Sequence, residues 1–340
     1  MVCGGATSGR TCPHDGAPTL SARPAEAELP REIDGHVLGA VLGRGGMGLV
    51  VEATAPDGSE VALKLLHPER ARELEQVQRF FREATAARRI DSRRVVRVLG
   101  LGVDPETERP YLVMECVRAP TLAEVLARGE PWPLDRALTL LLEVAEGLAA
   151  AHAAGVVHRD VKPANLFVTA AGARISDFGV AQVQDAGRLT STGVVLGTAS
   201  YMAPEQLQGT EVDGRADVYA LGCILHALLQ GRAPFESGEE PGRSYLAHLY
   251  ASAPPLLAEA YRRRPPWSAV EALSRELLAK APEDRPTAAA LCERLAALEL
   301  PPSPPDLVAS AEHSTRAHPR LRRRRWAVTA VLGLALTGSA

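Results

Sequence analysis

The pattern of hydrophobic and polar residues changes character partway along the chain. Between residues 37 and 116, short apolar runs are separated by turn residues such as the Pro-Asp-Gly-Ser segment at 56–59, which predicts strands joined by hairpins. From residue 134 onward, apolar residues recur at spacings of three and four, which predicts amphipathic helices. Because strands come first and helices second, the pattern predicts an α+β protein with two lobes, a small strand-rich one and a larger helical one.

One helix is expected inside the strand-rich part, over residues 72–89, where five apolar residues form a stripe at helical spacing. The expected strands lie at about 37–42, 50–53, 60–66, 95–99 and 110–116, with a short hairpin at 166–168 and 174–176. Further helices are expected at 134–154, after Asp213 and after Pro286.

Residues 1–31 are rich in Gly, Ala, Pro and Ser, which predicts a flexible leader. No apolar run follows the first residues, so no signal peptide is expected. Cys3, Cys12 and His14 fall in this leader. A zinc site needs about four ligands at short spacings, so loose polar residues are favoured over a metal site there.

The C-terminal end combines a Pro-containing linker at 298–321 with a basic cluster and an apolar segment at 322–340. Arg322 to Arg325 precede Trp326 in the order that the positive-inside rule favours for a membrane anchor. Residues 326–340, at about 1.5 Å each, reach only about 22 Å of the roughly 30 Å hydrocarbon core. Membrane association is therefore expected, and a disordered tail or packing on another protein are the alternatives.

The amino-acid composition indicates the size of the core, the redox compartment and the partners to expect. The chain has 340 residues, of which 46% are hydrophobic, so a sizeable core is available. Its five scattered cysteines do not form a disulfide framework, which favours a reducing cytoplasm. The net charge of −3 favours no particular partner, and no nucleic acid is expected.

The chemistry is concentrated in the His-Arg-Asp-Val-Lys-Pro-Ala-Asn segment at 158–165. Asp160 can accept the proton of an attacking hydroxyl, Lys162 can face a transferring phosphate, and Asn165 can hold a metal ion. A second carboxylate, Asp177, follows a short hairpin. Paired with the Asn165 amide, it suits Mg²⁺, which prefers oxygen ligands.

A glycine-rich stretch at 43–48 fits the pattern G-x-G-x-x-G between two predicted strands. Glycines there let the backbone approach phosphate groups closely. A dinucleotide-binding fingerprint would need a helix next, but residues 50–53 read as a strand. Lys64 is a lone cation in an apolar strand and needs a partner. Glu83, on the predicted helix at 72–89, is the carboxylate expected to reach it.

These motifs together resemble those of bacterial eukaryotic-type (Hanks-type) serine/threonine protein kinases. The resemblance covers about residues 33–297 and includes Gly-Arg-Gly-Gly-Met-Gly at 43–48, Val-Ala-Leu-Lys at 61–64, Ser-Asp-Phe-Gly at 176–179 and Ala-Pro-Glu at 203–205. It implies a kinase domain at 32–297, with the leader, linker and C-terminal segment outside it. Residues 91–94, Asp-Ser-Arg-Arg, depart from the family's His-Pro-Asn turn, where only a change of loop is expected.

The resemblance also implies roles for individual residues in binding ATP. The cofactors expected are ATP and Mg²⁺, with Mn²⁺ as the alternative metal, and Lys64 would grip the phosphates while paired with Glu83. Asp160, Lys162 and Thr198 would serve catalysis, and Asn165 and Asp177 would bind the metal. The nucleotide would contact Leu42, Gly43, Gly45, Gly46, Gly48, Val50, Ala62, Met114, Glu115, Val117 and Phe167.

Scaffold and regulatory roles follow from the same resemblance. Asp217 is expected to brace the catalytic loop, which is the segment at 158–165. Arg285 is expected to pair with Glu205. Thr190 and Thr192 are expected to be autophosphorylation sites whose phosphates pair with Arg159. The remaining structural positions are His158, Phe178 and Gly179.

The expected activity is transfer of the ATP γ-phosphate to Ser or Thr of protein substrates in bacterial signalling, with self-association where the kinase modifies itself. A pseudokinase scaffold would lack one of Lys64, Asp160 and Asp177, and all three are present. A small-molecule phosphotransferase would not be expected to combine the Ala-Pro-Glu segment with Arg285. The expected location is the cytoplasmic side of the membrane, with a soluble cytoplasmic protein as the alternative.

Overall fold

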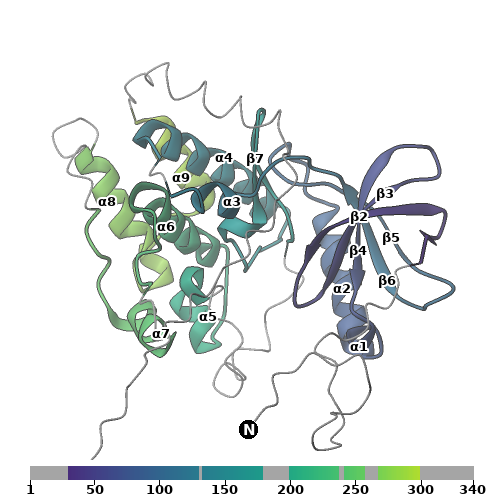
Figure 1. Ribbon diagram of the computed structural model, residues 1–340. Coiled ribbons are helices and arrows are strands. Elements are labelled where there is room, and N and C mark those ends of the chain that lie inside the picture. Colours follow the sequence, from purple (N-terminus) through teal and green to yellow (C-terminus); the bar gives the residue numbers. More distant parts are fainter. Residues whose placement is uncertain (1–29, 130–131, 179–198, 237–240, 257–266, 299–340) are drawn as a thin grey trace, which may run out of the picture. The chain divides into compact units, whose positions relative to one another are not determined.

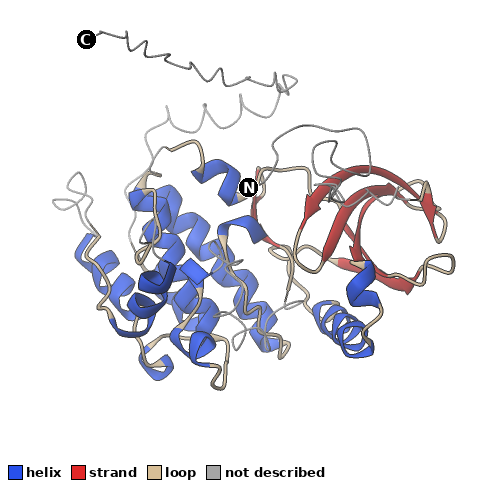
Figure 2. Cartoon of the chain, turned by 60° about the horizontal axis from the view of Figure 1, so that its bottom comes forward, coloured by secondary structure: helices blue, strands red, loops and turns tan. Residues whose placement is uncertain are grey.

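The computed structural model describes residues 30–129, 132–178, 199–236, 241–256 and 267–298 (Figure 1). The predicted two-lobed α+β fold is confirmed: a sheet with two helices forms one lobe and a group of helices forms the other (Figure 2). Several predictions fall outside the described residues. These concern the leader with Cys3, Cys12 and His14, the residues Gly179, Thr190, Thr192 and Thr198, and the C-terminal segment 322–340.

The strand-rich lobe is a six-stranded antiparallel sheet with the order β1-β2-β3-β4-β6-β5. Alternating side chains on its central strands contribute to two hydrophobic clusters, and Phe80 and Ala84 of α2 belong to the second of them. Its elements are β1 (Glu32–Ile33), β2 (His36–Arg44), β3 (Gly48–Thr54), β4 (Glu60–Leu66), α1 (Pro68–Ala71), α2 (Leu74–Ala87), β5 (Val98–Val103) and β6 (Pro110–Glu115).

One predicted strand is displaced. The strand expected at about 95–99 lies at Val98–Val103. The reason is that the backbone just before it bonds to the other lobe. Val95 forms a parallel bridge with Ile175, and the Val96 N–H donates to the Ile175 carbonyl at 2.8 Å. This segment therefore joins the lobes instead of extending the sheet.

The helical lobe is built around α4 and α6, whose residues are largely buried. A β-hairpin packs against α4 and carries the segment that leads to Asp177. The elements are α3 (Leu122–Leu126), α4 (Leu134–Ala153), β7 (Leu166–Thr169), β8 (Gly172–Ile175), α5 (Pro204–Gln208), α6 (Arg215–Gln230), α7 (Pro241–Tyr250), α8 (Trp267–Leu277) and α9 (Ala288–Ala296), with 3₁₀ turns at Pro163–Asn165, Ala199–Tyr201 and Pro282–Asp284. Among the described residues, no helix is long and apolar enough to cross a membrane.

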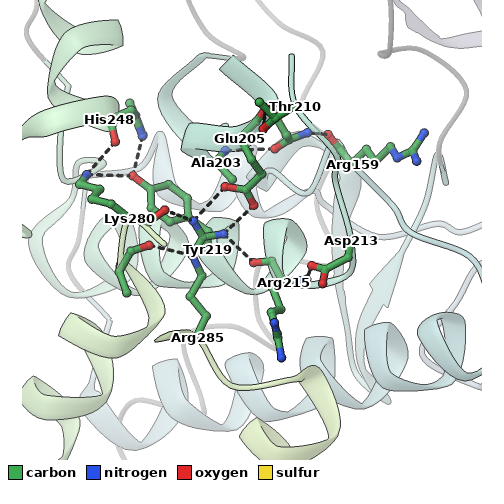
Figure 3. A network of polar contacts seen from close by, with 12 residues as sticks. Arg159, Ala203, Glu205, Thr210, Asp213, Arg215, Tyr219, His248, Lys280 and Arg285 are labelled. Atoms are coloured by element: carbon green, nitrogen blue, oxygen red, sulfur yellow. Dashed lines mark hydrogen bonds and ion pairs between the residues drawn. The ribbon is translucent and has the colours of Figure 1, made fainter. Parts of the chain in front are cut away.

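A buried ion pair ties the end of the helical lobe to α5. The two guanidinium ends of Arg285 donate to the two carboxylate oxygens of Glu205 at 2.6 and 2.9 Å, as predicted, and the Arg285 side chain is 0% exposed. Figure 3 shows this pair beside Tyr219, whose ring lies 4.8 Å from the guanidinium carbon. Arg285 also donates to the carbonyls of Ala279, Lys280 and Arg215, so all of its donor nitrogens are used.

Lys280 extends this network. Its ammonium donates to the His248 carbonyl at 2.7 Å and lies 4.2 Å from the centre of the Phe235 ring. Burial, with a smaller contribution from the nearby Arg285 charge, lowers the pKa of Lys280 to about 8. Burial also lowers the pKa of His248 to about 4, so this histidine is neutral at physiological pH.

We predict that Arg285→Met lowers the free energy of unfolding by about 3–5 kcal/mol, because it leaves the Glu205 carboxylate buried without its cation. Denaturant unfolding followed by circular dichroism measures the change. The control is Arg294→Met, which removes the ion pair to Glu276 between side chains 51% and 44% exposed. We expect that control to change stability by no more than about 1 kcal/mol. Equal losses in the two variants would contradict the prediction.

Candidate active site

The first part of the catalytic segment, residues 158–162, lies outside helices and strands and is held in place by one buried carboxylate. Asp217, in the first turn of α6, accepts the N–H groups of His158 at 2.9 Å and Arg159 at 2.7 Å, and the His152 ring at 2.8 Å. Arg159 has φ of 65°, a left-handed conformation that non-glycine residues rarely adopt. The predicted bracing role of Asp217 therefore corresponds to contacts that fix this backbone.

Asp160 is the candidate proton acceptor. Its Oδ2 receives the Lys162 ammonium at 2.8 Å and the Asn165 side-chain amide at 3.1 Å. The same Asn165 amide nitrogen donates to the Asp160 carbonyl at 2.9 Å. Because that NH₂ group faces Asp160, the Asn165 amide oxygen is left as the atom available to a metal ion. The structure thus brings together the three residues that the sequence placed in this loop.

His158 connects this loop to the segment that carries Asp177. Its Nδ1 accepts the Asp160 N–H at 3.2 Å, and its Nε2 donates to the Ser176 carbonyl at 2.9 Å. This pattern requires a neutral imidazole with the proton on Nε2. The Phe178 ring packs 4.6 Å from the His158 ring, centre to centre.

Asp177 lies directly against Lys64. The Lys64 ammonium is 2.5 Å from Asp177 Oδ1. This contact joins β4 of the strand-rich lobe to the loop after β8. Burial acts to raise the pKa of Asp177, but the charge and the hydrogen bond of Lys64, together with other nearby charges such as Lys162, outweigh burial and hold that pKa below its ordinary value. Asp177 is therefore an anion at neutral pH, as a metal ligand must be.

The predicted pair between Lys64 and Glu83 is wrong for this structure. Glu83 accepts instead from Arg79 at 2.9 Å, one turn earlier on α2, while Lys64 is taken by Asp177. The second oxygen of Glu83, Oε2, is buried and has no hydrogen-bond partner among the described residues. Burial raises the pKa of Glu83 despite the opposing effect of Arg79. Its free oxygen marks the place where a second cation would be stabilised.

The glycine-rich loop is a tight turn between β2 and β3. The Gly45 N–H donates to the Gly48 carbonyl at 2.9 Å, and the His67 ring bonds the Gly45 carbonyl at 2.9 Å. A Cβ on Gly48 would lie 2.0 Å from the Leu65 carbonyl oxygen, so only glycine fits there. A Cβ on Gly43, Gly45 or Gly46 would meet nothing within 4 Å, so the backbone of the loop is open to approach by a ligand.

Four predicted nucleotide residues share one face of the sheet. Val50 lies opposite Lys64 in the β3–β4 register, and Ala62 lies opposite Met114 in the β4–β6 register. Since directly opposed residues point to the same face, and Ala62 and Lys64 are two apart, all four face the same way. A small hollow is lined on this side by Lys64, Val98, Leu112, Met114, Asp177 and Phe178, together with Ala84, Ala87 and Val96.

The remaining predicted nucleotide residues border this face. Leu42, near the end of β2, is 52% exposed, and Phe167 in β7 forms a bridge with Thr121. Val117 lies in the connection between β6 and α3 and is partly buried. Glu115 uses its side chain elsewhere: Arg174 donates to both of its oxygens at 2.7 Å, and this hydrogen bonding lowers the pKa of Glu115.

A second small hollow is lined by Arg159, Asp160, Tyr201, Met202, Gln206 and Asp217, among others. Gln206 was not among the predicted site residues. Its amide donates to the Arg159 carbonyl at 2.7 Å and accepts the Ala203 N–H at 3.0 Å, so it links the loop to the Ala-Pro-Glu segment. The signal for it in the sequence was its place directly after Glu205.

Comparison with known proteins gives a consistent result. The family model described as "Protein kinase domain" matches residues 37–295. The chain is 39% identical over 260 residues to the probable serine/threonine-protein kinase PknB of Corynebacterium glutamicum, covering 74% of this chain and 40% of that protein. It is 35% identical over 301 residues to serine/threonine-protein kinase PknB of Mycobacterium leprae, covering 84% and 46%. The chain thus spans less than half the length of these relatives.

Among solved structures, the Mycobacterium tuberculosis PknI kinase domain superposes with a TM-score of 0.60 at 28% identity. The superposition covers 78% of this chain and 96% of that domain. The predicted resemblance to bacterial serine/threonine protein kinases is confirmed by these relatives.

Proposed function

Because the chain belongs to the protein kinase domain family, we propose that it is an ATP-dependent serine/threonine protein kinase active in bacterial signalling. The observation that carries the proposal is the convergence of Lys64, Asp160, Asn165 and Asp177, from two lobes, on one site. A pseudokinase would lack one of these groups. The domain we assign to this activity is residues 32–297, with its substrates on other proteins or on a second copy of this chain.

The nucleotide fits against the shared face of β3, β4 and β6, with its phosphates under the glycine-rich loop. Family membership implies ATP and a divalent metal ion. We assign Mg²⁺ because the free oxygen of Asn165 and the anionic Asp177 provide the hard oxygen ligands that it prefers. When bound, the metal supplies charge that offsets the phosphates. Lys64 then contacts the nucleotide phosphates. The unpaired oxygen of Glu83 is the acceptor that holds the Lys64 ammonium in that position.

The transfer itself depends on positioning and charge. Asp160 orients the substrate hydroxyl and accepts its proton as the oxygen attacks the γ-phosphate. Lys162, held 2.8 Å from Asp160 Oδ2, offsets the negative charge on the transferred group. Thr198 is proposed to hydrogen-bond near these two residues, in line with the Gly-Thr segment typical of serine/threonine kinases.

We predict that Asp160→Asn lowers the phosphorylation rate by about 10²–10⁴-fold, because it removes the proton acceptor. Nucleotide affinity, measured by calorimetry, should stay within about twofold of wild type, since the Asn165 and Lys64 contacts remain. Asp91→Asn, at an exposed position, is the control and should retain full activity. Transfer of ³²P from ATP to a generic protein measures the rate. Wild-type rates in Asp160→Asn would rule out the assigned role.

We also predict autophosphorylation on Thr190 and Thr192. Support comes from Arg159, which precedes Asp160 and whose Nε is buried without a partner among the described residues. Mass spectrometry of active protein should find phosphate on at least one of the two threonines. The double variant to Ala should lose activity at least severalfold, while Thr139→Ala, on an exposed position of α4, should not. Active protein with both threonines unmodified would exclude them as activating sites.

Finally, we propose that residues 322–340 attach the cytoplasmic kinase domain to a membrane, on the strength of the arginine cluster, Trp326 and the apolar segment. Cell fractionation of the full chain should place it in the membrane fraction. A variant that ends at Pro319 should be in the soluble fraction. Full-length protein found only in the soluble fraction would refute attachment and leave the kinase activity untouched.

A further inference from the structure

Arg94 stands where the sequence departs from the usual kinase turn. Residues 91–94 form a loop, as expected, but the Arg94 side chain in that loop is buried. It is only 9% exposed, although the neighbouring Arg93 is exposed to solvent. A buried arginine must have its donors satisfied, because an unpaired buried charge is strongly destabilising. The Arg94 guanidinium therefore needs acceptors close to it.

Its partners lie on the helical lobe. One terminal nitrogen, Nη1, is 2.9 Å from Glu143 and 3.1 Å from the Ala171 carbonyl, and Nε is 2.9 Å from Glu146. Glu143 also accepts the Ala173 N–H at 2.8 Å through its second oxygen. Arg94 and Glu143 therefore hold the β7–β8 turn from both sides, through the carbonyl before Gly172 and the amide after it.

The backbone of the same residue holds the other end of β8. The Ile175 N–H donates to the Arg94 carbonyl at 2.7 Å. Between these two ends of β8, the Arg174 guanidinium donates to both oxygens of Glu115 and to the Val95 carbonyl, the last at 2.9 Å. Strand β8 is thus bound along its length by the segment around Arg94, and Asp177 follows two residues after Ile175.

Two glycines make room for the guanidinium and its neighbours. A Cβ on Gly172, where φ is +108°, would lie 2.1 Å from Arg94 Nη1 and 2.2 Å from Glu143. A Cβ on Gly147 would lie 3.0 Å from Arg94 Cβ and 2.7 Å from the Ile175 side chain. Residues from two separate parts of the chain, α4 and the β7–β8 hairpin, are therefore shaped around this one arginine.

We propose that Arg94 is a positioning residue for the metal-binding carboxylate Asp177. It fixes the β7–β8 hairpin against α4, and so fixes where Asp177 presents its oxygens. The inference rests on the proposed function only in taking Asp177 as a ligand of the nucleotide-bound metal. A buried ion pair is weak support for stability, because apolar replacements of similar volume are often neutral or stabilising. Its charge-assisted bonds do give directional restraint, which apolar packing does not.

The test is the Mg²⁺ dependence of nucleotide binding by the full chain. ADP affinity is measured by calorimetry in EDTA and over a series of Mg²⁺ concentrations, for wild type, Arg94→Met and the adjacent control Arg93→Met. We expect Arg94→Met to raise the half-saturating Mg²⁺ concentration by about tenfold, because the hairpin that positions Asp177 loses its restraint; about tenfold is also the lower end of the effect of losing a residue that orients a metal ligand. ADP affinity in EDTA should change by less than about twofold, and Arg93→Met should match wild type throughout.

A purely structural role predicts a different result, namely a lower melting temperature with unchanged Mg²⁺ dependence, and that result would overturn the proposal. An equal loss of ADP affinity with and without Mg²⁺ would overturn it too. If Arg94→Met does not fold, Arg94→Lys and Glu143→Gln replace it. Glu143→Gln keeps an acceptor for Ala173 but loses the charge that faces Arg94, so it should also shift the Mg²⁺ dependence. Failure of the wild type to phosphorylate proteins would refute the proposed function while leaving this binding result intact.

Discussion

The first part of the catalytic loop, residues 158–162, lies outside any helix or strand, and Asp217 supplies the hydrogen-bond acceptors that the local backbone lacks. Backbone N–H groups buried without partners are costly, so an irregular segment in the interior needs acceptors from elsewhere. One carboxylate, 1% exposed, takes two consecutive N–H groups and a histidine ring. With those bonds in place, Arg159 can hold a left-handed conformation. That conformation turns the next residue, Asp160, toward Lys162 and Asn165, so the position of the proton acceptor follows from the hydrogen-bond requirements of the two residues before it.

Charge pairing in the site is a competition among a few groups. Lys64 is the partner available to both Asp177 and Glu83, and in this structure it lies with Asp177 while Arg79 takes one oxygen of Glu83. The cost appears at Glu83, whose other oxygen is buried and unpaired and whose pKa is raised. A metal ion at Asp177 would replace the charge that Lys64 now provides there. The two carboxylates are coupled through Lys64, whose charge acts to lower the pKa of each of them.

The fold and most of the chemistry could be predicted from the sequence, since periodicity sets which face of an element is buried and motif spacing sets the catalytic groups. The ion pair between Glu205 and Arg285 was expected because each belongs to a recognisable segment. The partner of Glu83 was not, because periodicity places a carboxylate on a helix face but does not decide which of two nearby cations it meets. The start of β5 was missed for a similar reason: Val95 and Val96 suit a strand, and only the three-dimensional structure shows that their strand partner is Ile175.

Arg94 shows most clearly what could not be predicted from the sequence, because nothing in its local sequence distinguishes it from the exposed arginines around it. Its burial depends on Glu143 and Glu146 on α4, and on two glycines whose missing side chains leave the necessary space. Such a site is specified jointly by positions far apart in the sequence. Arg94 also lies on the backbone between α2, which carries Glu83, and β5, and its carbonyl accepts from Ile175 of β8, two residues before Asp177. Through its bonds to α4 and to Ile175, this junction between the lobes is tied to the strand that leads to Asp177.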